Sequence, residues 1–290
     1  MTDAMLSPSE WPAAVRDAAR TVTGPPVEVA RLGGMGGGAV WRVRSEGATV
    51  VVKRGRRSVE AHVYTTLAET FEAHGIAIPR LHLSEGSWLV IEDIPRPLPR
   101  ERWEADGELL ATLRRLHSLP LDRSALPPDA FVPAWPESMS LATLSLCPEP
   151  ERIDLAPLLQ RARQEARPLF EPVCPISGDP NPLNWGLRDD GRLVLFDWER
   201  FTLGAPAIDL AITVPGLGAG AAYRRVATTY LGSGASPEEI DGLARSIRLA
   251  KVWSVVEFLH GVVSGSVKPG FSVDTLVEQV AAWLRSELFP

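Results

Sequence analysis

Two carboxylates and one carboxamide occur close together in the segment Cys174–Glu199. Asp179 and Asn184 flank a loop rich in proline, and Asp197 follows the apolar run Val194–Phe196. The run is typical of a buried strand, so the Asp197 carboxylate is expected where that strand ends in a cleft. Amide and carboxylate oxygens suit Mg²⁺ that is shared with nucleotide phosphates, which predicts a metal site at Asn184 and Asp197. The carboxylate of Asp179 is left to accept a proton from an attacking hydroxyl.

The segment resembles the catalytic core of the aminoglycoside phosphotransferase and choline kinase superfamily, which are small-molecule kinases with a protein-kinase-like fold. The family pattern is H-G-D-x-x-x-x-N, then I-D-[FW]-[EG], then G-x-P-x-x-D-L-A. This chain has Ser177-Gly178-Asp179 and Asn184, then Phe196-Asp197-Trp198-Glu199, then the run Gly204–Ala211. The resemblance implies transfer of the γ-phosphoryl group of ATP to a small-molecule hydroxyl, with Mg²⁺ as the second cofactor.

One position departs from the family pattern. Ser177 stands where the family usually has His, a residue that orients the loop through hydrogen bonds. We interpret the change as altered support of the loop, and the resemblance makes Asp209 a structural brace. Asp and Asn are also turn formers, so Asp179 and Asn184 alone would fit two surface turns. The ordered segments around Asp197 and Asp209 favour the catalytic interpretation.

A glycine-rich run lies between two short predicted strands near the start of the chain. The strands are Val27–Leu32 and Ala39–Val43, and Gly34, Gly36 and Gly37 lie between them. Glycines let backbone N–H groups approach an anion closely, so this hairpin is expected to lie over the phosphates of a nucleotide. A plain flexible hairpin explains the glycines equally well.

The next predicted strand, Ala48–Lys53, ends in a lysine. In kinases a lysine at the end of such an apolar, β-branched run delivers its ammonium group to the α- and β-phosphates. Glu60 opens a helical pattern soon afterwards, and the resemblance implies that it pairs with Lys53. The alternative is an ordinary edge-strand lysine and a solvated glutamate.

The segment before the prolines at 95, 97 and 99 completes the predicted N-terminal lobe. Trp88–Ile94 resembles the family strand that leads into the hinge, where backbone groups from Glu92 to Ile94 would hold the adenine edge. We therefore expect an α+β, protein-kinase-like two-lobed fold. Residues 1–94 are expected to form a small lobe of five antiparallel strands and one helix, and residues 95–290 a larger, mainly helical lobe.

Helical spacing of apolar residues predicts most of the second lobe. The expected helices are Trp103–Leu119, Ile153–Phe170, Ala219–Leu231, Ser236–Leu249, Lys251–Val263 and Ser272–Phe289, with an earlier one at Trp11–Thr21. The stretch Pro120–Pro150 is rich in proline and is interpreted as a long loop. His117 lies near the end of the first of these helices and is interpreted as a structural histidine, neither base nor ligand.

Composition narrows the classes of protein further. The 290 residues are 45% hydrophobic, enough for a buried core, and a net charge of −6 argues against a general nucleic-acid binder. The sequence predicts no membrane span and no secretory signal. Cys147 and Cys174 are expected to be reduced. We expect a cytoplasmic monomer or weak homodimer whose partner is a hydroxylated small molecule.

The acceptor is predicted from acidic residues on the two segments expected to line the substrate cleft. These acids are Asp122, Asp129, Glu137 and Glu149 in the proline-rich stretch and Glu257 on a late helix. Carboxylates in a water-poor cleft favour a cationic antibiotic such as an aminoglycoside, bound by Glu257, Asp122 and Glu137. Solvated surface positions explain each acid individually. The alternatives are a kinase for a choline-like amino alcohol or a sugar, and a nucleotide-binding member without catalysis.

Overall fold

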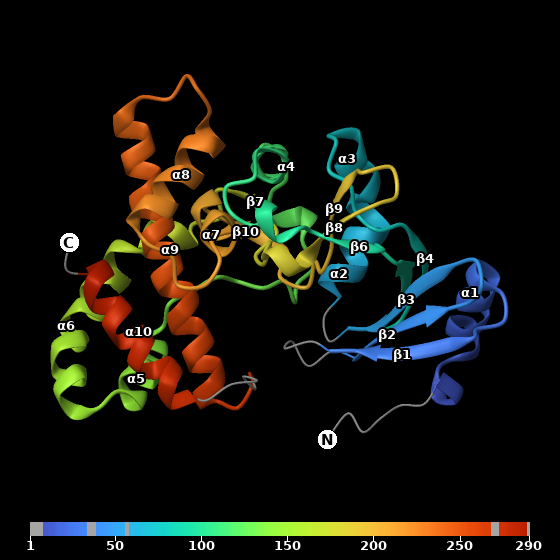
Figure 1. Ribbon diagram of the computed structural model, residues 1–290, viewed down its shortest axis with the longest axis horizontal. Coiled ribbons are helices and arrows are strands. Elements are labelled where there is room, and N and C mark those ends of the chain that lie inside the picture. Colours follow the sequence, from blue (N-terminus) through green and yellow to red (C-terminus); the bar gives the residue numbers. More distant parts are fainter. Residues whose placement is uncertain (1–7, 34–38, 56–57, 268–272, 289–290) are drawn as a thin grey trace. The chain divides into compact units, whose positions relative to one another are not determined.

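The computed structural model describes residues 8–33, 39–55, 58–267 and 273–288 (Figure 1). The chain divides into two compact units. The first contains Met1–Pro97 together with two later segments, Ser124–Phe131 and Asn184–Phe201, and the second contains the remainder. A single cut after Ile94 therefore does not describe the first unit, because residues far along the chain contribute to it.

An antiparallel five-stranded sheet forms the centre of the first unit, as predicted. Its strands are β1 (Glu28–Leu32), β2 (Ala39–Arg44), β3 (Thr49–Arg54), β4 (Leu81–Glu85) and β5 (Trp88–Glu92), in the order β1-β2-β3-β5-β4. In central strand β3, Val50 and Val52 are fully buried, and Lys53 follows opposite Leu89 of β5. Central β3 thus places the Lys53 side chain at the end of an apolar, paired strand.

Helix α1 (Ala13–Thr23) packs against this sheet and buries an aromatic cluster. Trp11 lies just before the helix, and its ring centroid is 5.3 Å from that of Trp41 of β2. Trp41 in turn stacks on Trp88 of β5, with 5.8 Å between the ring centroids. Such aromatic pairs contribute about 0.5–1.5 kcal/mol each beyond their burial. The first unit therefore has a second helix in addition to the one that carries Glu60.

Glu60 lies on a helical stretch made of α2 (Val59–His62), a π-helical turn η2 (Val63–Leu67) and α3 (Ala68–Ala73). The N-terminal end of α2 is held by Asp129, whose carboxylate accepts hydrogen bonds from the Ser58 backbone N–H (2.8 Å) and from the Ser58 hydroxyl. Ser58 provides no side-chain cap of its own, and Asp129 satisfies the backbone N–H at this helix end. A residue of the proline-rich stretch thereby fixes the start of the Glu60 helix.

The segment Asn184–Phe201 joins the first unit through a small sheet and through Arg188. Strands β6 (Arg96–Pro97), β8 (Trp185–Leu187) and β9 (Leu193–Leu195) pair antiparallel in the order β6-β8-β9. The guanidinium of Arg188 donates to both carboxylate oxygens of Glu92 at 2.8 and 2.7 Å and to the Ile78 carbonyl at 2.9 Å. A bidentate, largely buried pair of this kind fixes both distance and orientation.

The second unit is mainly helical. Its helices are α4 (Gly107–His117), α5 (Glu137–Leu146), α6 (Glu149–Glu165), α7 (Pro206–Ile212), α8 (Gly220–Leu231), α9 (Pro237–Val263) and α10 (Val273–Leu288). Helix α9 packs against α5, α7 and α8, while the short strands β7 (Cys174–Ile176) and β10 (Thr202–Gly204) pair antiparallel. Strand β7 leads directly into the loop that carries Asp179, and α7 carries Asp209.

Two predictions for this unit were wrong in detail. The stretch 120–150 is not one long loop, since it contains α5. That helix buries Ser140, Thr143 and Leu144, so only one of its buried residues is large and apolar, and no apolar periodicity marks it. The two helices predicted on either side of Ala250 are a single helix, α9, because no helix-breaking residue separates them and a capping box of Ser236 and Glu239 starts it.

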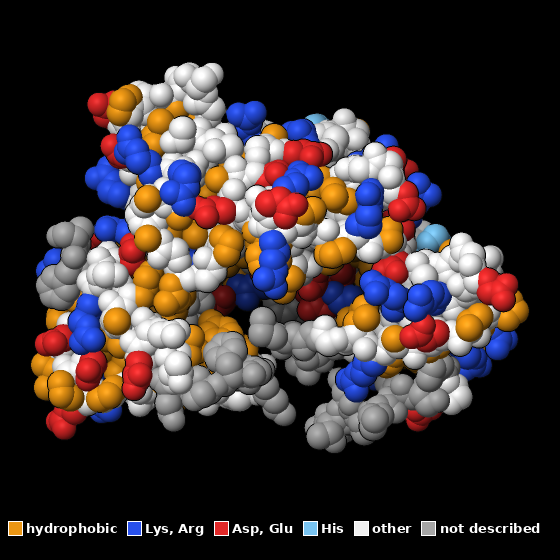
Figure 2. All heavy atoms as spheres, viewed as in Figure 1, with side chains coloured by type: hydrophobic (Ala, Val, Ile, Leu, Met, Phe, Trp, Pro, Cys, Tyr) orange, Lys and Arg blue, Asp and Glu red, His pale blue; other side chains and the backbone are white. Residues whose placement is uncertain are grey.

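Charged side chains of both signs are interspersed over the face shown in Figure 2, without a broad patch of one sign. In the residues that the structure describes, no helix has the length and apolar character needed to cross a membrane.

Candidate functional site

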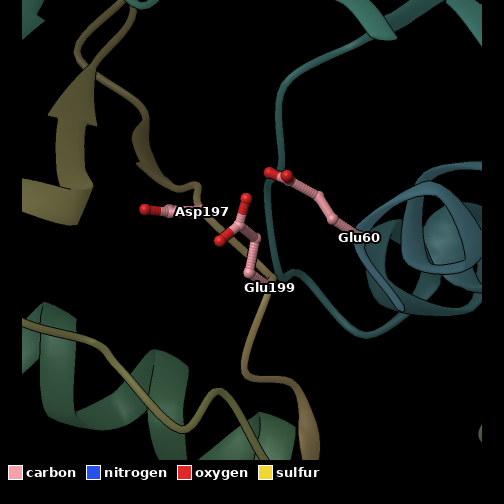
Figure 3. Close-up of side chains that lie close together, drawn as sticks. All are labelled: Glu60, Asp197 and Glu199. Atoms are coloured by element: carbon pink, nitrogen blue, oxygen red, sulfur yellow. The ribbon is translucent and has the colours of Figure 1, made fainter. Parts of the chain in front are cut away.

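The ammonium group of Lys53 lies within a cluster of three carboxylates in the first unit. Its Nζ is 2.7 Å from Glu60 Oε2, 2.6 Å from Asp197 Oδ1 and 3.3 Å from Glu199 Oε1. Figure 3 shows Glu60, from α2, and Glu199, from the loop after β9, with their carboxylates directed toward one another. The predicted contact between Lys53 and Glu60 is present, and the lysine also contacts the carboxylate predicted to bind metal.

Burial and charge act in opposite directions on the pKa values of this cluster. Burial alone would lower the pKa of Lys53, but the carboxylates of Glu60, Asp197 and Glu199 outweigh it and hold that pKa above its ordinary value. Burial raises the pKa of Glu60 to about 7 against the opposing effect of Lys53. Lys53 therefore remains an ammonium ion, as an interaction with phosphate requires.

Backbone geometry brings Asn184 and Asp197 into the same part of the first unit. The Phe196 N–H donates to the Asn184 carbonyl at 3.0 Å, so the residue before Asp197 is hydrogen-bonded to Asn184. Asp197 has a φ of 64°, in the left-handed region that Asp tolerates better than most residues. Such a conformation costs roughly 1–3 kcal/mol and is concentrated at functional sites. It turns Asp197 out of the strand direction at the end of β9.

The oxygen donors of this region fit a divalent cation. One carboxylate oxygen from each of Glu60, Asp197 and Glu199 lies within 4.8 Å of the others. Three carboxylates around one ammonium leave an excess of negative charge, and hard oxygen donors are the ligands that Mg²⁺ prefers. The donor set therefore suits the predicted ion. It also includes Glu199, which was not predicted as a ligand although it belongs to the Phe196–Glu199 motif.

Asp179 lies in a loop of the second unit that is held by Asp209. The two carboxylate oxygens of Asp209 accept hydrogen bonds from the backbone N–H groups of Ser177 and Gly178, both at 2.8 Å. Gly178 has a φ of 78°, which allows the chain to turn immediately before Asp179. The fully buried Asp209 thus fixes the backbone on the N-terminal side of Asp179.

His117 and Tyr230 form a chain of polar contacts that ends at Asp209. His117 Nε2 is 3.1 Å from Asp209 Oδ2, and its Nδ1 is 2.9 Å from the Tyr230 hydroxyl. His117 is thus a fully engaged structural histidine. The hydroxyl of Ser177 is buried and makes no hydrogen bond within the described part of the chain, so in this structure the side chain at the family's histidine position does not hold the loop.

The structure describes only some of the residues predicted to contact the nucleotide. Gly34, Gly36 and Gly37 lie outside the described residues. The Glu92 backbone N–H donates to the Arg80 carbonyl at 2.8 Å, and its side chain binds Arg188. Glu92 is therefore engaged within the first unit, while Ile94 follows the end of β5. Arg188 was missed by sequence reasoning because it follows a short strand beside Asp189-Asp190-Gly191, where an arginine resembles a solvated turn residue.

The acids considered as acceptor contacts differ in their surroundings. Asp129 belongs to the first unit and binds Ser58, whereas Glu137 starts α5, is 3.6 Å from Arg163 and has a 71% exposed side chain. Asp122 is exposed, and Glu257 is partly exposed on α9. Trp253, one turn before Glu257, is packed against Phe170 and is 1% exposed. The cluster of three close carboxylates found in the described residues contains none of these acids.

Comparison with known proteins supports the interpretation of the fold. Residues 29–259 match the Phosphotransferase enzyme family. Ethanolamine kinase of Plasmodium vivax is similar in structure, with a TM-score of 0.64 and 14% identity over 99% of this chain and 93% of that chain. No curated protein shows a significant match to the sequence.

Two further structures resemble this one. A choline/ethanolamine kinase family protein from Mesorhizobium loti has a TM-score of 0.62 and 18% identity, covering 95% of both chains. The ADP-bound aminoglycoside phosphotransferase APH(2'')-Ib has a TM-score of 0.57 and 17% identity over 95% of this chain and 98% of that one. These similarities show a protein-kinase-like fold of the kind found in small-molecule kinases. The chain belongs to the phosphotransferase enzyme family.

Proposed function

We propose that the protein transfers the γ-phosphoryl group of ATP to a hydroxyl group of a small molecule. The observation that supports this most strongly is the position of Lys53, whose ammonium contacts both Glu60 and Asp197. A strand lysine held by a helix glutamate, next to a carboxylate suited to a metal, is the arrangement that phosphoryl transfer requires. The ADP bound to a protein of similar fold is consistent with ATP as the donor.

Each of the remaining site residues has a role in this proposal. The acceptor hydroxyl gives its proton to Asp179, and its oxygen forms a bond to the γ-phosphorus. The bond from that phosphorus to the β,γ-bridging oxygen breaks, and ADP leaves. Lys53 neutralises charge on the α- and β-phosphates, while Asp209 keeps the Asp179 loop in place. Phosphoryl transfer depends chiefly on such positioning and charge neutralisation.

The proposal includes Mg²⁺ as a cofactor. Asn184 and Asp197 would hold the ion, and Glu199 adds a third oxygen donor close to Asp197. When bound, the ion would offset the negative charge of the phosphates. The backbone groups from Glu92 to Ile94 and the glycines at 34, 36 and 37 are proposed to contact the nucleotide.

For the acceptor we propose a hydroxylated molecule that carries a cationic nitrogen, either a protonated amine or a quaternary ammonium group. This chemistry is shared by aminoglycosides and by ethanolamine and choline, and kinases named for both groups have the fold of this protein. An aminoglycoside is the acceptor we favour. The acids Asp122, Glu137 and Glu257 are its proposed contacts, although they do not form one tight cluster.

The proposal is tested by measuring ADP release from Mg·ATP with a panel of aminoglycosides, amino alcohols, neutral sugars and neutral antibiotics. We expect acceptor-dependent release with at least one amine-bearing alcohol, and a phosphorylated product one phosphate heavier by mass spectrometry. The Asp179→Asn variant serves as the inactive control. Tight ATP binding without transfer to any acceptor would favour the non-catalytic alternative, and transfer only to neutral acceptors would remove the cationic substrate class while leaving the phosphotransferase reaction.

A further inference from the structure

The loop that carries Asp179 contains a second polar side chain that binds it. Asn181 Nδ2 donates to Asp179 Oδ1 at 3.0 Å, and Asn181 Oδ1 accepts from the Leu183 backbone N–H at 2.9 Å. The amide oxygen of Asn181 thus closes an Asx turn over residues 181–183, while its amide nitrogen binds Asp179. Both ends of one amide are used within a loop of six residues.

The orientation of the Asn181 amide follows from these two contacts. A backbone N–H can only donate, so its partner must be the amide oxygen. The group facing Asp179 is therefore the NH₂ group, which donates to the carboxylate. Pro180 and Pro182 flank Asn181, and proline restricts both its own φ and the conformation of the residue before it. The backbone and the side chain of Asn181 are consequently held in one arrangement.

From this geometry we propose that Asn181 is a positioning residue for the proton-accepting carboxylate of Asp179. Its NH₂ group binds Oδ1 and thereby fixes the rotation of the carboxylate that receives the proton of the acceptor hydroxyl. A hydrogen bond donated to the ionised form also keeps Asp179 charged, which is the state that accepts a proton. This inference rests on the proposed function, in which Asp179 is that acceptor.

The role of Asn181 also accounts for how the loop is held without the family histidine. Asp209 binds the backbone on the N-terminal side of Asp179, through Ser177 and Gly178, whereas the Ser177 hydroxyl makes no hydrogen bond in the described residues. Asp209 does not touch the Asp179 side chain directly in any of these contacts. Asn181, on the C-terminal side of Asp179, does contact that side chain.

The sharpest test is Asn181→Asp. Aspartate has nearly the same size, and its carboxylate can still accept from the Leu183 N–H and keep the turn. It cannot donate to Asp179, however, and instead places a negative charge beside Oδ1. We expect kcat to fall about 10- to 100-fold, as for the loss of a hydrogen bond to a charged group, with little change in the KM for ATP. The acid limb of the kcat–pH profile should move to higher pH.

Two controls separate this role from general damage to the loop. Asp190→Asn makes the reverse exchange in another Asx turn, where Asp190 Oδ1 accepts from the Arg192 N–H at 2.9 Å on the exposed β8–β9 turn, and should leave kcat unchanged. Asn181→Asp should add little to the loss caused by Asp179→Asn, because both changes act through one carboxylate. An undiminished additional loss in that background would overturn the proposal, as would wild-type kcat in the single variant.

A measurement that needs no acceptor completes the test. The Asp179 carboxyl carbon can be titrated by ¹³C NMR, with its signal assigned by its loss in Asp179→Asn. We expect a higher pKa of Asp179 in both Asn181→Asp and Asn181→Ala, with Asp190→Asn unchanged. An unaltered titration would refute the role of Asn181 even if the protein phosphorylates an acceptor. Absence of transfer to every acceptor, with the pKa raised as expected, would refute the proposed function alone.

Discussion

Lys53 Nζ lies 2.6 Å from Asp197 Oδ1, although the two residues are 144 positions apart in the chain. Lys53 is the penultimate residue of a central strand of the five-stranded sheet, and Asp197 follows the last strand of the small β6-β8-β9 sheet. The contact therefore unites, within one compact unit, a group suited to phosphate and a group suited to a metal.

Replacing Lys53 should affect stability as well as ATP use. Lys53→Met leaves the buried carboxylate of Glu60 without its cation, and removal of one partner from a buried pair costs about 3–5 kcal/mol. We expect a lower midpoint of urea unfolding and a strongly raised KM for ATP. The double variant Lys53→Met with Glu60→Gln should recover much of the stability but none of the ATP use. Full activity of Lys53→Met would show that this lysine has no part in nucleotide binding.

Removing the proton acceptor should separate binding from chemistry. Asp179→Asn keeps the size of the side chain, so ATP should bind as in the wild type while turnover falls by about 10²–10⁴-fold. Calorimetric titration with a non-hydrolysable ATP analogue and a steady-state ADP assay check the two halves of the prediction. If turnover is undiminished, Asp179 contributes only to the loop.

The buried amine of Lys251 should make stability depend on pH. Its Nζ donates to the carbonyls of Ala211 and Val214 at 3.2 and 2.6 Å near the end of α7, and burial lowers the pKa of Lys251 to about 8 from 10.5. The unfolded chain therefore binds more protons than the folded chain between those two pH values, so stability rises with pH in that window. Below pH 8 the folded protein bears the full free-energy cost of burying the charged amine.

We expect the free energy of unfolding of the wild type to rise between pH 7.5 and pH 10 relative to that of Lys251→Met, by up to roughly 3 kcal/mol. Urea unfolding of both proteins at several pH values measures this difference in unfolding free energy. The other titrating groups are the same in both proteins, so their contributions cancel. Parallel curves for the two proteins would show that Lys251 keeps an ordinary pKa in the folded state.

The pair of Arg188 and Glu92 should be a major support of the first unit. Their bidentate contact joins the end of β5 to the turn after β8, and the Arg188 side chain is only 9% exposed. Arg188→Met should destabilise the protein by about 2–5 kcal/mol. Arg192→Met, in which a 59% exposed arginine of the same turn is removed, is the matched control and should change stability by less than about 1 kcal/mol. Equal effects of the two variants would contradict a special role for Arg188.

Local patterns account for the parts of the fold that the sequence predicted well. Neighbouring residues are enough to recognise the β-branched run before Lys53 and the apolar spacing of helices such as α4 and α8. The motif from Ser177 to Ala211 then indicated which residues belong to the site and in which order they occur. Long-range pairs were beyond such reasoning. Nothing near Arg188 in the sequence indicates that it binds Glu92, and nothing near Asp129 indicates that it caps α2.

The site residues show the same difference between what local sequence patterns predict and what long-range contacts decide. Glu60 was found because its distance from Lys53 fits the family pattern, whereas Glu199 stood in the quoted motif without an assigned role. The acids expected to bind the acceptor were chosen because they lie on segments expected to line the cleft, and the position of a segment does not determine which way a side chain faces. Asp129 illustrates this, since one of the acids of the proline-rich stretch that were available for the cleft accepts a hydrogen bond from the backbone N–H of Ser58.

That bond between Asp129 and Ser58 has a consequence for the evolution and engineering of the protein. Asp122 and Glu137, which lie on either side of Asp129 in the sequence, are proposed to contact the acceptor, yet the Asp129 carboxylate holds the start of the helix that carries Glu60. Exchanging the stretch that contains these residues for that of a relative would therefore alter the partner of Lys53, and with it the affinity for ATP. If the proposed acceptor contacts are correct, this bond links acceptor range to nucleotide affinity, and a graft that keeps an acid at position 129 should retain ATP binding better than one that removes it.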